Sequence, residues 1–299
     1  MDAALAQLAR SQGGVLTWGQ VGDRNTAHRL LRGGEVVRVR RGVLGLASVP
    51  ADRLRLAAAV LVTAADVVVS HESAAAVHGL PLLRPYAGPP VLSRVRPSVG
   101  PVPARQRVSP LASYVDPVDR VVLVGMPVTT AARTAVDLAR RGSLAGGVVV
   151  VDAVLRAGLP RRQLEEVLAR CIGWPGTRLA ARAVELGDAL AESPLESLVR
   201  VRLHEGGLPA PQLQVQLGGR YGPVARVDLL VERRVVVEAD GMSKYADAFV
   251  LREEKLREDR LRDLGFEVVR VTWAEALHHP EILVSRVLRA LARAESRAA

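Results

Sequence analysis

The start of the chain alternates between helical and strand-like spacing of its apolar side chains. Apolar residues recur at helical intervals over residues 3–11, and two further short helices are expected, capped by Thr17 and by Asn25 or Thr26. Residues 35–47 then alternate between apolar and polar positions as two strands around a tight turn. Three helices followed by a β-hairpin predict a winged helix-turn-helix domain.

The middle of the chain gives a mixed and less regular pattern. Residues 67–79 predict a strand that leads into a helix, and residues 121–141 predict a strand, a turn at Pro127 and a helix. Residues 147–171 predict two more helices. His71 and His78 lie seven residues apart without a third ligand type nearby, so packing or capping roles are favoured over metal binding.

The last third of the chain has the most specific pattern. A helix is expected to start here, with Ser193 as its N-cap and Pro194 at its first position. Glu196, at the third position, would complete a capping box. The elements expected after this helix are strands at 212–218, 224–231 and 235–240, a turn at 232–234, a helix at 247–264, a strand at 266–273 and a closing helix after residue 280. The order is αβββαβα.

Together these patterns predict a multidomain protein of the α+β or α/β class. We expect a winged helix-turn-helix domain at 1–50, a mixed middle domain at 51–190 and an αβββαβα domain at 191–299. With 299 residues, 49% of them hydrophobic, the chain is long enough for two or three packed domains. No apolar run approaches the length of a membrane span, and one cysteine, Cys171, favours a buried thiol in a reducing cytoplasm.

The net charge of +10 changes the picture, because basic proteins of this kind most often bind nucleic acid. The third helix and the hairpin are rich in basic residues, whereas Asp23 and Glu35 are the acids nearby. Such density fits phosphate contacts beside a helix that reads a groove, although a basic face can also be merely solvated. The candidate DNA-binding residues are Arg24, His28, Arg29, Arg32, Arg38, Arg40 and Arg41.

Three acids stand in two neighbouring predicted strands in the last third of the chain. Asp228 lies in an apolar strand, and Glu238 and Asp240 end the next strand on one face. A three-residue turn would set Asp228 opposite Glu238, so the three carboxylates are expected to converge. Carboxylates held so close favour a shared divalent ion, and oxygen ligands favour Mg²⁺ or Mn²⁺, which would activate water at a phosphodiester.

The two lysines of the chain, Lys244 and Lys255, come soon after these acids, while 39 positions carry arginine. Lysine can lose its proton when it is desolvated and arginine cannot, so a retained lysine hints at a chemical role. Lys244 is the stronger candidate. For Lys255, a surface pair with Glu254 or Asp259 is the favoured alternative.

The last third of the chain resembles the bacterial domains related to very-short-patch repair endonucleases, in the PD-(D/E)XK superfamily. The resemblance rests on SPLES, ARVDLLV, VVVEADG and EEKLREDRLRDLGFEVVRVTW. It implies a restriction-endonuclease-like fold, metal ligation by Asp228 and Glu238, and Glu196 as a further acid. Asp240 stands where the motif usually has lysine, so Lys244 or Lys255 would have to supply the amine.

The first segment is similar to the winged-helix domain of the antitoxins of type IV abortive-infection toxin-antitoxin systems, through GGVLTWGQV and GEVVRVRRGVLGLA. The middle, with VVSHESAAAVHGLPL and GMPVTTAARTAVDLA, resembles the region after that domain in related regulator-like proteins. This resemblance implies DNA binding and autoregulation. It says nothing of catalysis.

Two functions therefore stand side by side. The first is a metal-dependent endodeoxyribonuclease delivered to DNA by the winged helix, with Asp228, Glu238, Asp240 and Lys244 as catalytic residues. The alternative is an antitoxin-like transcriptional regulator whose nuclease fold is inactive. A lysine amine near the carboxylates favours the enzyme, whereas acids paired with Arg226 or Arg252 favour the inactive fold. The candidate partners are DNA, a cognate toxin and a second copy of the chain. We do not expect the chain to bind a membrane.

Overall fold

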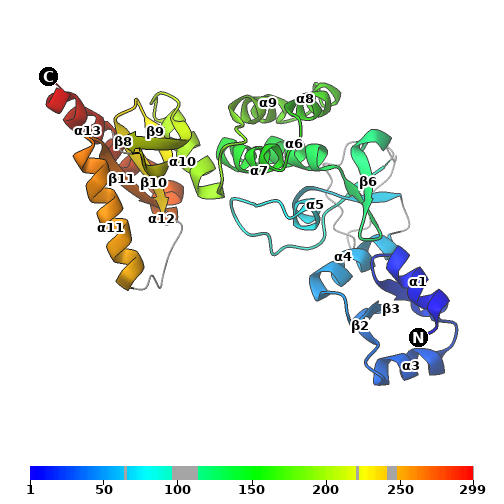
Figure 1. The fold of residues 1–299 in the computed structure, drawn as a ribbon. Helices are drawn as coiled ribbons and strands as arrows, with labels where there is room; N and C mark the ends of the chain where they lie inside the picture. Colours follow the sequence, from blue (N-terminus) through cyan, green and yellow to red (C-terminus); the bar gives the residue numbers. More distant parts are fainter. Residues whose placement is uncertain (64–65, 96–113, 220–221, 241–247, 299) are drawn as a thin grey trace. The chain divides into compact units, whose positions relative to one another are not determined.

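The structure is a computed structural model that describes residues 1–63, 66–95, 114–219, 222–240 and 248–298. The chain divides into two compact units, Met1–Leu80 with Arg84–Leu138, and Pro81–Leu83 with Ala139–Ala299. Each unit contains helices and sheet, so the chain has the expected mixed, multidomain character (Figure 1). The division into domains at 1–50, 51–190 and 191–299 stays a prediction.

The first unit begins with three helices and a hairpin, as predicted. Its elements are α1 (Ala3–Ser11), β1 (Val15–Thr17), α2 (Trp18–Val21), α3 (Arg24–Arg32), β2 (Val36–Arg40) and β3 (Val43–Leu46), with the sheet order β1-β3-β2. Thr17 caps α2 in a complete capping box with Gln20. The prediction for α3 was wrong by two or three residues, because the side chain of Asp23 caps it and accepts from the Thr26 N–H at 2.9 Å.

The rest of the first unit surrounds a second sheet. It contains α4 (Ala51–Val62), β4 (Val67–Val69), α5 (His71–His78), β5 (Leu92–Arg94), the 3₁₀ turn η1 (Pro117–Asp119), β6 (Arg120–Leu123), β7 (Met126–Thr129) and the part of α6 (Ala131–Arg141) up to Leu138. The sheet order is β5-β4-β7-β6. The turn expected at Pro127 is wrong, because Pro127 lies within β7 opposite Val122 and the chain reverses at Val124 and Gly125.

A buried ion cluster holds η1 against α6 in this unit. Arg133 Nε lies 2.8 Å from the Asp137 carboxylate, and its Nη1 lies 3.0 Å from that of Asp119. The three side chains are 1–3% exposed. Because buried charges are tolerated only when they are paired, this guanidinium compensates for the burial of the two carboxylates.

The second unit opens with helices and ends with a sheet. The helices are α7 (Leu144–Arg156), α8 (Arg161–Arg170), α9 (Thr177–Leu186) and α10 (Pro194–Glu205), and Cys171 is buried after α8, as expected. The elements after α10 are β8 (Gln212–Gly219), β9 (Gly222–Val231), β10 (Val235–Asp240), α11 (Ala248–Asp263), β11 (Glu267–Thr272), α12 (Trp273–His278) and α13 (Pro280–Ala298). The predicted order αβββαβα is present, and α12 is an additional short helix.

The sheet of the second unit has the order β11-β10-β9-β8. β9 pairs antiparallel with both β8 and β10, whereas β10 and β11 are parallel. The central strands are apolar on both faces: Leu229, Val231, Val235 and Val237 are fully buried, and Leu230 and Val236 pack with Leu261 of α11. No helix among the described residues is long and apolar enough to cross a membrane.

Candidate nucleic-acid interface and carboxylate pair

The seven basic residues predicted to bind DNA are all exposed on α3, β2 and the turn after β2. We call them the basic face. Ala27 and Leu30 turn the other side of α3 into the core of the segment. None of the seven forms an ion pair with a residue that the structure describes. Their charges are therefore available to an external anion.

The two acids next to the basic face, Asp23 and Glu35, are already engaged by other groups. Hydrogen bonds from the Thr26 backbone and side chain lower the pKa of Asp23, which keeps this carboxylate ionised as the cap of α3. The carboxylate of Glu35 pairs with the amino group of Met1. The Arg29 charge of the basic face also lowers the pKa of Asp23, as a smaller effect than the hydrogen bonds from Thr26.

One aromatic residue joins the basic face of α3 to that of the hairpin. The Trp18 ring contacts the His28 ring edge to face, with 5.7 Å between the centroids. The guanidinium of Arg38 on β2 lies 5.7 Å from the centroid of the same indole. Trp18 thus contacts basic side chains of both α3 and β2. Trp18 was not among the predicted site residues, although its place just before two basic elements is visible in the sequence.

The two histidines of α5 have packing roles, as the sequence favoured. His71 is buried, and its Nδ1 lies 3.0 Å from the hydroxyl of Ser70. His78 Nε2 lies 2.7 Å from the carbonyl oxygen of Thr129. Among the described residues no group of three His, Cys, Asp or Glu side chains could hold a metal ion.

Asp228 and Glu238 lie one residue beyond the last paired residues of β9 and β10. The backbone pairing joins Val231 to Val235 and ends at Leu229 and Val237, and one further step sets Asp228 opposite Glu238, as predicted. Instead of a strand–strand bond, the backbone N–H of Ala239 donates to the Asp228 carboxylate at 2.9 Å. The side chain thus replaces a backbone acceptor and holds the strands apart at their ends.

An arginine from α11 occupies the other carboxylate. Arg257 donates to Glu238 Oε1 at 2.8 Å and to the carbonyl oxygen of Arg226 at 2.7 Å. Arg226 itself pairs with Glu192 through two hydrogen bonds of 2.9 and 2.7 Å. Because a guanidinium already neutralises Glu238 and no third acid completes the group, the described residues do not fit a divalent ion as they stand.

Glu196 takes a role that differs from the predicted capping box. The hydroxyl of Ser193 accepts from the Glu196 N–H at 3.1 Å, but the Glu196 carboxylate accepts from the N–H of Glu192 rather than that of Ser193. The same oxygen accepts from Gln214 Nε2 at 2.8 Å. Glu196 is buried, so these donors compensate for its loss of water.

Gln214 is a residue of this region that was not predicted from the sequence. The pairings of β8 with β9 on either side of it place Gln214 opposite Asp228, and its backbone has a left-handed φ of 51°. Its side-chain oxygen is buried without a hydrogen-bond partner among the described residues. A polar residue between the apolar positions of β8 was the available signal.

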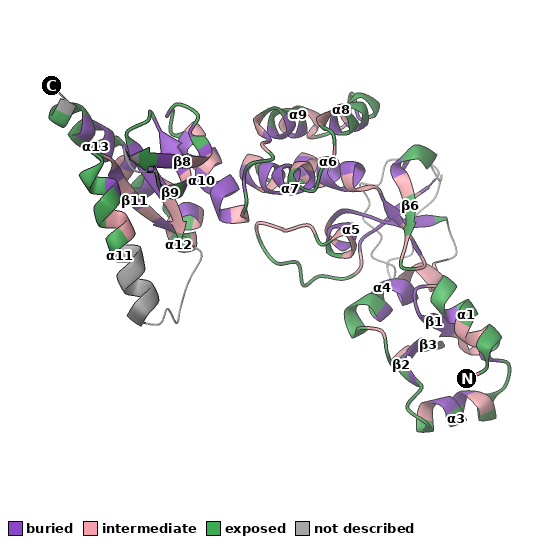
Figure 2. Cartoon of the chain, viewed as in Figure 1, coloured by how far each residue is buried: buried purple, intermediate pink, exposed green. Residues whose placement is uncertain are grey.

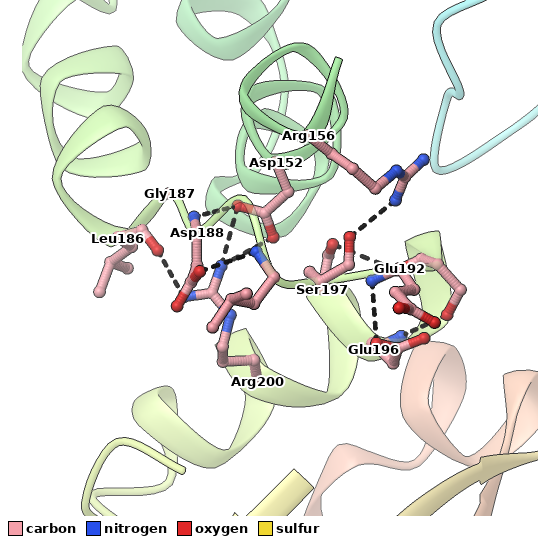
Figure 3. A network of polar contacts seen from close by, with 12 residues as sticks. Asp152, Arg156, Leu186, Gly187, Asp188, Glu192, Glu196, Ser197 and Arg200 are labelled. Carbon is pink, nitrogen blue, oxygen red and sulfur yellow. Dashed lines mark hydrogen bonds and ion pairs between the residues drawn. The ribbon is translucent and has the colours of Figure 1, made fainter. Parts of the chain in front are cut away.

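The chain that leads into α10 is held by buried polar contacts (Figure 3). The Asp152 carboxylate accepts from the guanidinium of Arg200 at 2.7 and 2.9 Å and from the N–H of Asp188 at 2.7 Å. Burial raises the pKa of Asp152, and the neighbouring Arg200 charge opposes that effect. Arg156 also donates to the carbonyl oxygen of Ala191 at 2.7 Å. The position of Glu196 therefore depends on α7 as well as on α10.

The remaining predicted residues are placed only in part. Asp240 is exposed, and its backbone pairs with Thr272 on β11. Lys244 lies outside the described residues. Lys255 lies in α11, but its side chain is outside the described part of the chain. A lysine amine near the carboxylates would favour the nuclease over the inactive fold. Its presence there therefore stays a prediction.

The middle of the chain is similar to a known protein family. Residues 64–189 match the family described as the AbiEi antitoxin C-terminal domain. Two proteins of Mycobacterium tuberculosis, the uncharacterized proteins MT2308 of strain CDC 1551 and Rv2248 of strain H37Rv, are each 30% identical over 203 residues. That alignment covers 67% of this chain and 72% of each relative. The chain therefore belongs to one family with these two mycobacterial proteins, and its residues 64–189 are similar to the AbiEi antitoxin C-terminal domain.

Proposed function

We propose that the chain is an antitoxin-like, DNA-binding regulator whose C-terminal sheet serves as a scaffold rather than as a nuclease. The observation that carries this proposal is the match of residues 64–189 to the antitoxin family, after a segment with an exposed basic face. In this proposal residues 1–50 form a winged helix that binds DNA, and the region from 64 to 189 acts against a cognate toxin.

The chemistry of the basic face supports the DNA-binding part of the proposal. Its seven basic side chains are exposed, and the nearby acids Asp23 and Glu35 are engaged in a cap and an ion pair. Arginines placed this way neutralise phosphates, and a helix beside a hairpin is the usual arrangement of a winged helix on a groove. Trp18 keeps the two basic elements together.

The surroundings of the carboxylate pair support the scaffold part. Glu238 is held by Arg257, and the Asp228 carboxylate accepts the backbone N–H of Ala239. Both contacts occupy lone pairs of the carboxylate oxygens, which a metal ion would need as ligands. The motif lysine is replaced by Asp240, which adds negative charge where a nuclease of the resembling family has a positive one.

The proposal predicts DNA binding without DNA cleavage. The purified chain is incubated with a labelled duplex from upstream of its own reading frame, in Mg²⁺, Mn²⁺ or EDTA, and each sample is run on a native and on a denaturing gel. We expect a salt-sensitive shift on the native gel and intact strands on the denaturing gel under all three conditions. Strand breaks that need metal, or no shift at low salt, would contradict the proposal.

DNA hydrolysis is a second candidate function, favoured by Asp228 lying opposite Glu238 where two strands part. It requires Arg257 to leave Glu238, and Glu196 and the oxygen of Gln214 are additional ligand types in this region. Asp228→Ala, Lys244→Ala and Arg257→Ala belong in the same gel series. Metal-dependent nicking that is lost in the first two variants and increased in the third would establish this candidate.

A further inference from the structure

Among the residues that the structure describes, β6 is an open edge of the first unit, and exposed valines lie on it and directly before and after it. It ends the sheet β5-β4-β7-β6. Val118, Val121, Val122 and Val124, which we call the valine edge, are 66, 37, 72 and 46% exposed (Figure 2). Natural edge strands are usually protected by lysine, proline, a bulge or a covering element, because open edges pair with other chains. On β6 the one charged side chain is Arg120.

The backbone of this edge points its hydrogen-bonding groups away from the sheet. Thr130 donates its N–H to the carbonyl oxygen of Asp119 at 2.9 Å, so this pair is a bonded one. Bonded and non-bonded pairs alternate along an antiparallel ladder, and Val122 pairs with Pro127 at a non-bonded position. A proline fits there because it has no N–H to give. The N–H and C=O of Val122 therefore face outward.

The turn after β6 has valine, Val124, at a position where asparagine or glycine is the preferred residue. Val124 and Gly125 form the two-residue loop, with φ values of 46° and 76°. Asn and Gly are preferred at such positions, whereas a β-branched residue with positive φ is strained. Val124 is also about half exposed, so burial within the chain offsets little of that strain. An observed outlier of this kind points to a role outside the fold of the single chain.

We propose that β6 pairs antiparallel with β6 of a second copy, with Val122 opposite Val122, and thereby joins two sheets into one. A two-fold antiparallel pair lets one short strand supply both sides of the interface. In this register Arg120 lies opposite Val124 of the other copy, so no like charges meet. The apolar side chains of the valine edge do not suit nucleic acid.

This dimer rests on the proposed function for its purpose but not for its existence. The valine edge and the basic face lie in the same compact unit. Pairing through β6 would present two basic faces in a fixed two-fold relation, which is how winged and other helix-turn-helix dimers bind two half-sites. The dimer thus predicts a DNA site with two-fold symmetry.

Sedimentation of the full chain over a roughly 100-fold range of concentration tests the proposal. Val122→Pro removes an N–H that faces outward, and Val122→Lys places a charge at the centre of the interface. Ile172→Lys, at a position 77% exposed in the other unit, is the matched control. We expect dimers for the native chain and Ile172→Lys, and dissociation at least ~10-fold easier for both Val122 variants. A native monomer, or Val122 variants that remain dimeric, overturns the proposal.

Val124→Asn separates strain from association. This substitution should raise the melting temperature of the monomer, because Asn tolerates the left-handed backbone. It should also weaken the dimer, because it removes one apolar side chain of the valine edge. A lower melting temperature would refute the strain argument. If the native chain is dimeric but does not shift DNA, the proposed function fails and the dimer stands. If it is monomeric and shifts DNA, the reverse holds.

Discussion

Replacing Arg133 by Met is expected to lower the free energy of unfolding of the first unit by about 3–5 kcal/mol. The guanidinium lies 3.0 Å from the Asp119 carboxylate and 2.8 Å from that of Asp137, and all three groups are nearly inaccessible to water. Met has a similar length but no charge, so two buried acids lose their common cation. Urea unfolding followed by circular dichroism measures the loss.

Arg162→Met is the matched control for this experiment. Arg162 also pairs with an acid, Glu166, four residues along its helix, but it is 81% exposed and the distance is 3.4 Å. Exposed pairs of this kind contribute at most about 0.5 kcal/mol. Equal urea midpoints for Arg133→Met and Arg162→Met would show that the buried cluster does not hold η1 to α6.

Loss of three arginines from the basic face is expected to weaken duplex binding on the order of 10²–10³-fold. The variant combines Arg29→Ala, Arg32→Ala and Arg40→Ala, which lie on α3 and β2 and form no ion pair with described residues. If each contacts one phosphate, the slope of log affinity against log salt also becomes shallower by about 3. Fluorescence anisotropy with a labelled duplex measures both quantities.

The control removes the same charge elsewhere. Arg162, Arg178 and Arg289 are exposed on helices of the second unit, so their triple alanine variant has the same net charge. A general electrostatic attraction would weaken equally in both triple variants. If the two lose the same affinity and the same salt slope, the basic face is not the DNA-binding surface.

Elements whose signals are local were predicted well from the sequence. Thr17, and Ser193 with Pro194, were predicted to mark helix starts, and both helices begin there. The register of β9 with β10, which ends one step before Asp228 and Glu238, followed from a short turn and the two-residue period of a strand. These signals need no knowledge of the rest of the chain.

Features that depend on contacts between distant segments were not predicted. Pro127 was expected in a turn, yet it lies in β7 because the neighbouring position on β6 needs no donor from it. The hydrogen bond of Gln214 to Glu196 and the ion pair of Arg257 with Glu238 join elements that lie apart in the sequence. Residue spacing does not show which of many arginines reaches a given acid.

The carboxylate pair illustrates how that gap affects function. Arg226 and Arg252 were the arginines expected to neutralise the acids of an inactive fold. Arg226 pairs with Glu192 instead, and the guanidinium on Glu238 comes from Arg257, more than one helical turn beyond Arg252. A partly buried acid recruits a cation, as expected, but the identity of that cation depends on how α11 packs on the sheet.

A reporter gene placed behind the DNA upstream of this chain's own reading frame tests the central claim most directly. We expect the native chain to repress the reporter, and the triple variant of Arg29, Arg32 and Arg40 to leave it active at equal protein level. Asp228→Ala should repress as the native chain does, because regulation needs no cleavage. A reporter that the native chain leaves unchanged, or repression that depends on Asp228, would contradict the account.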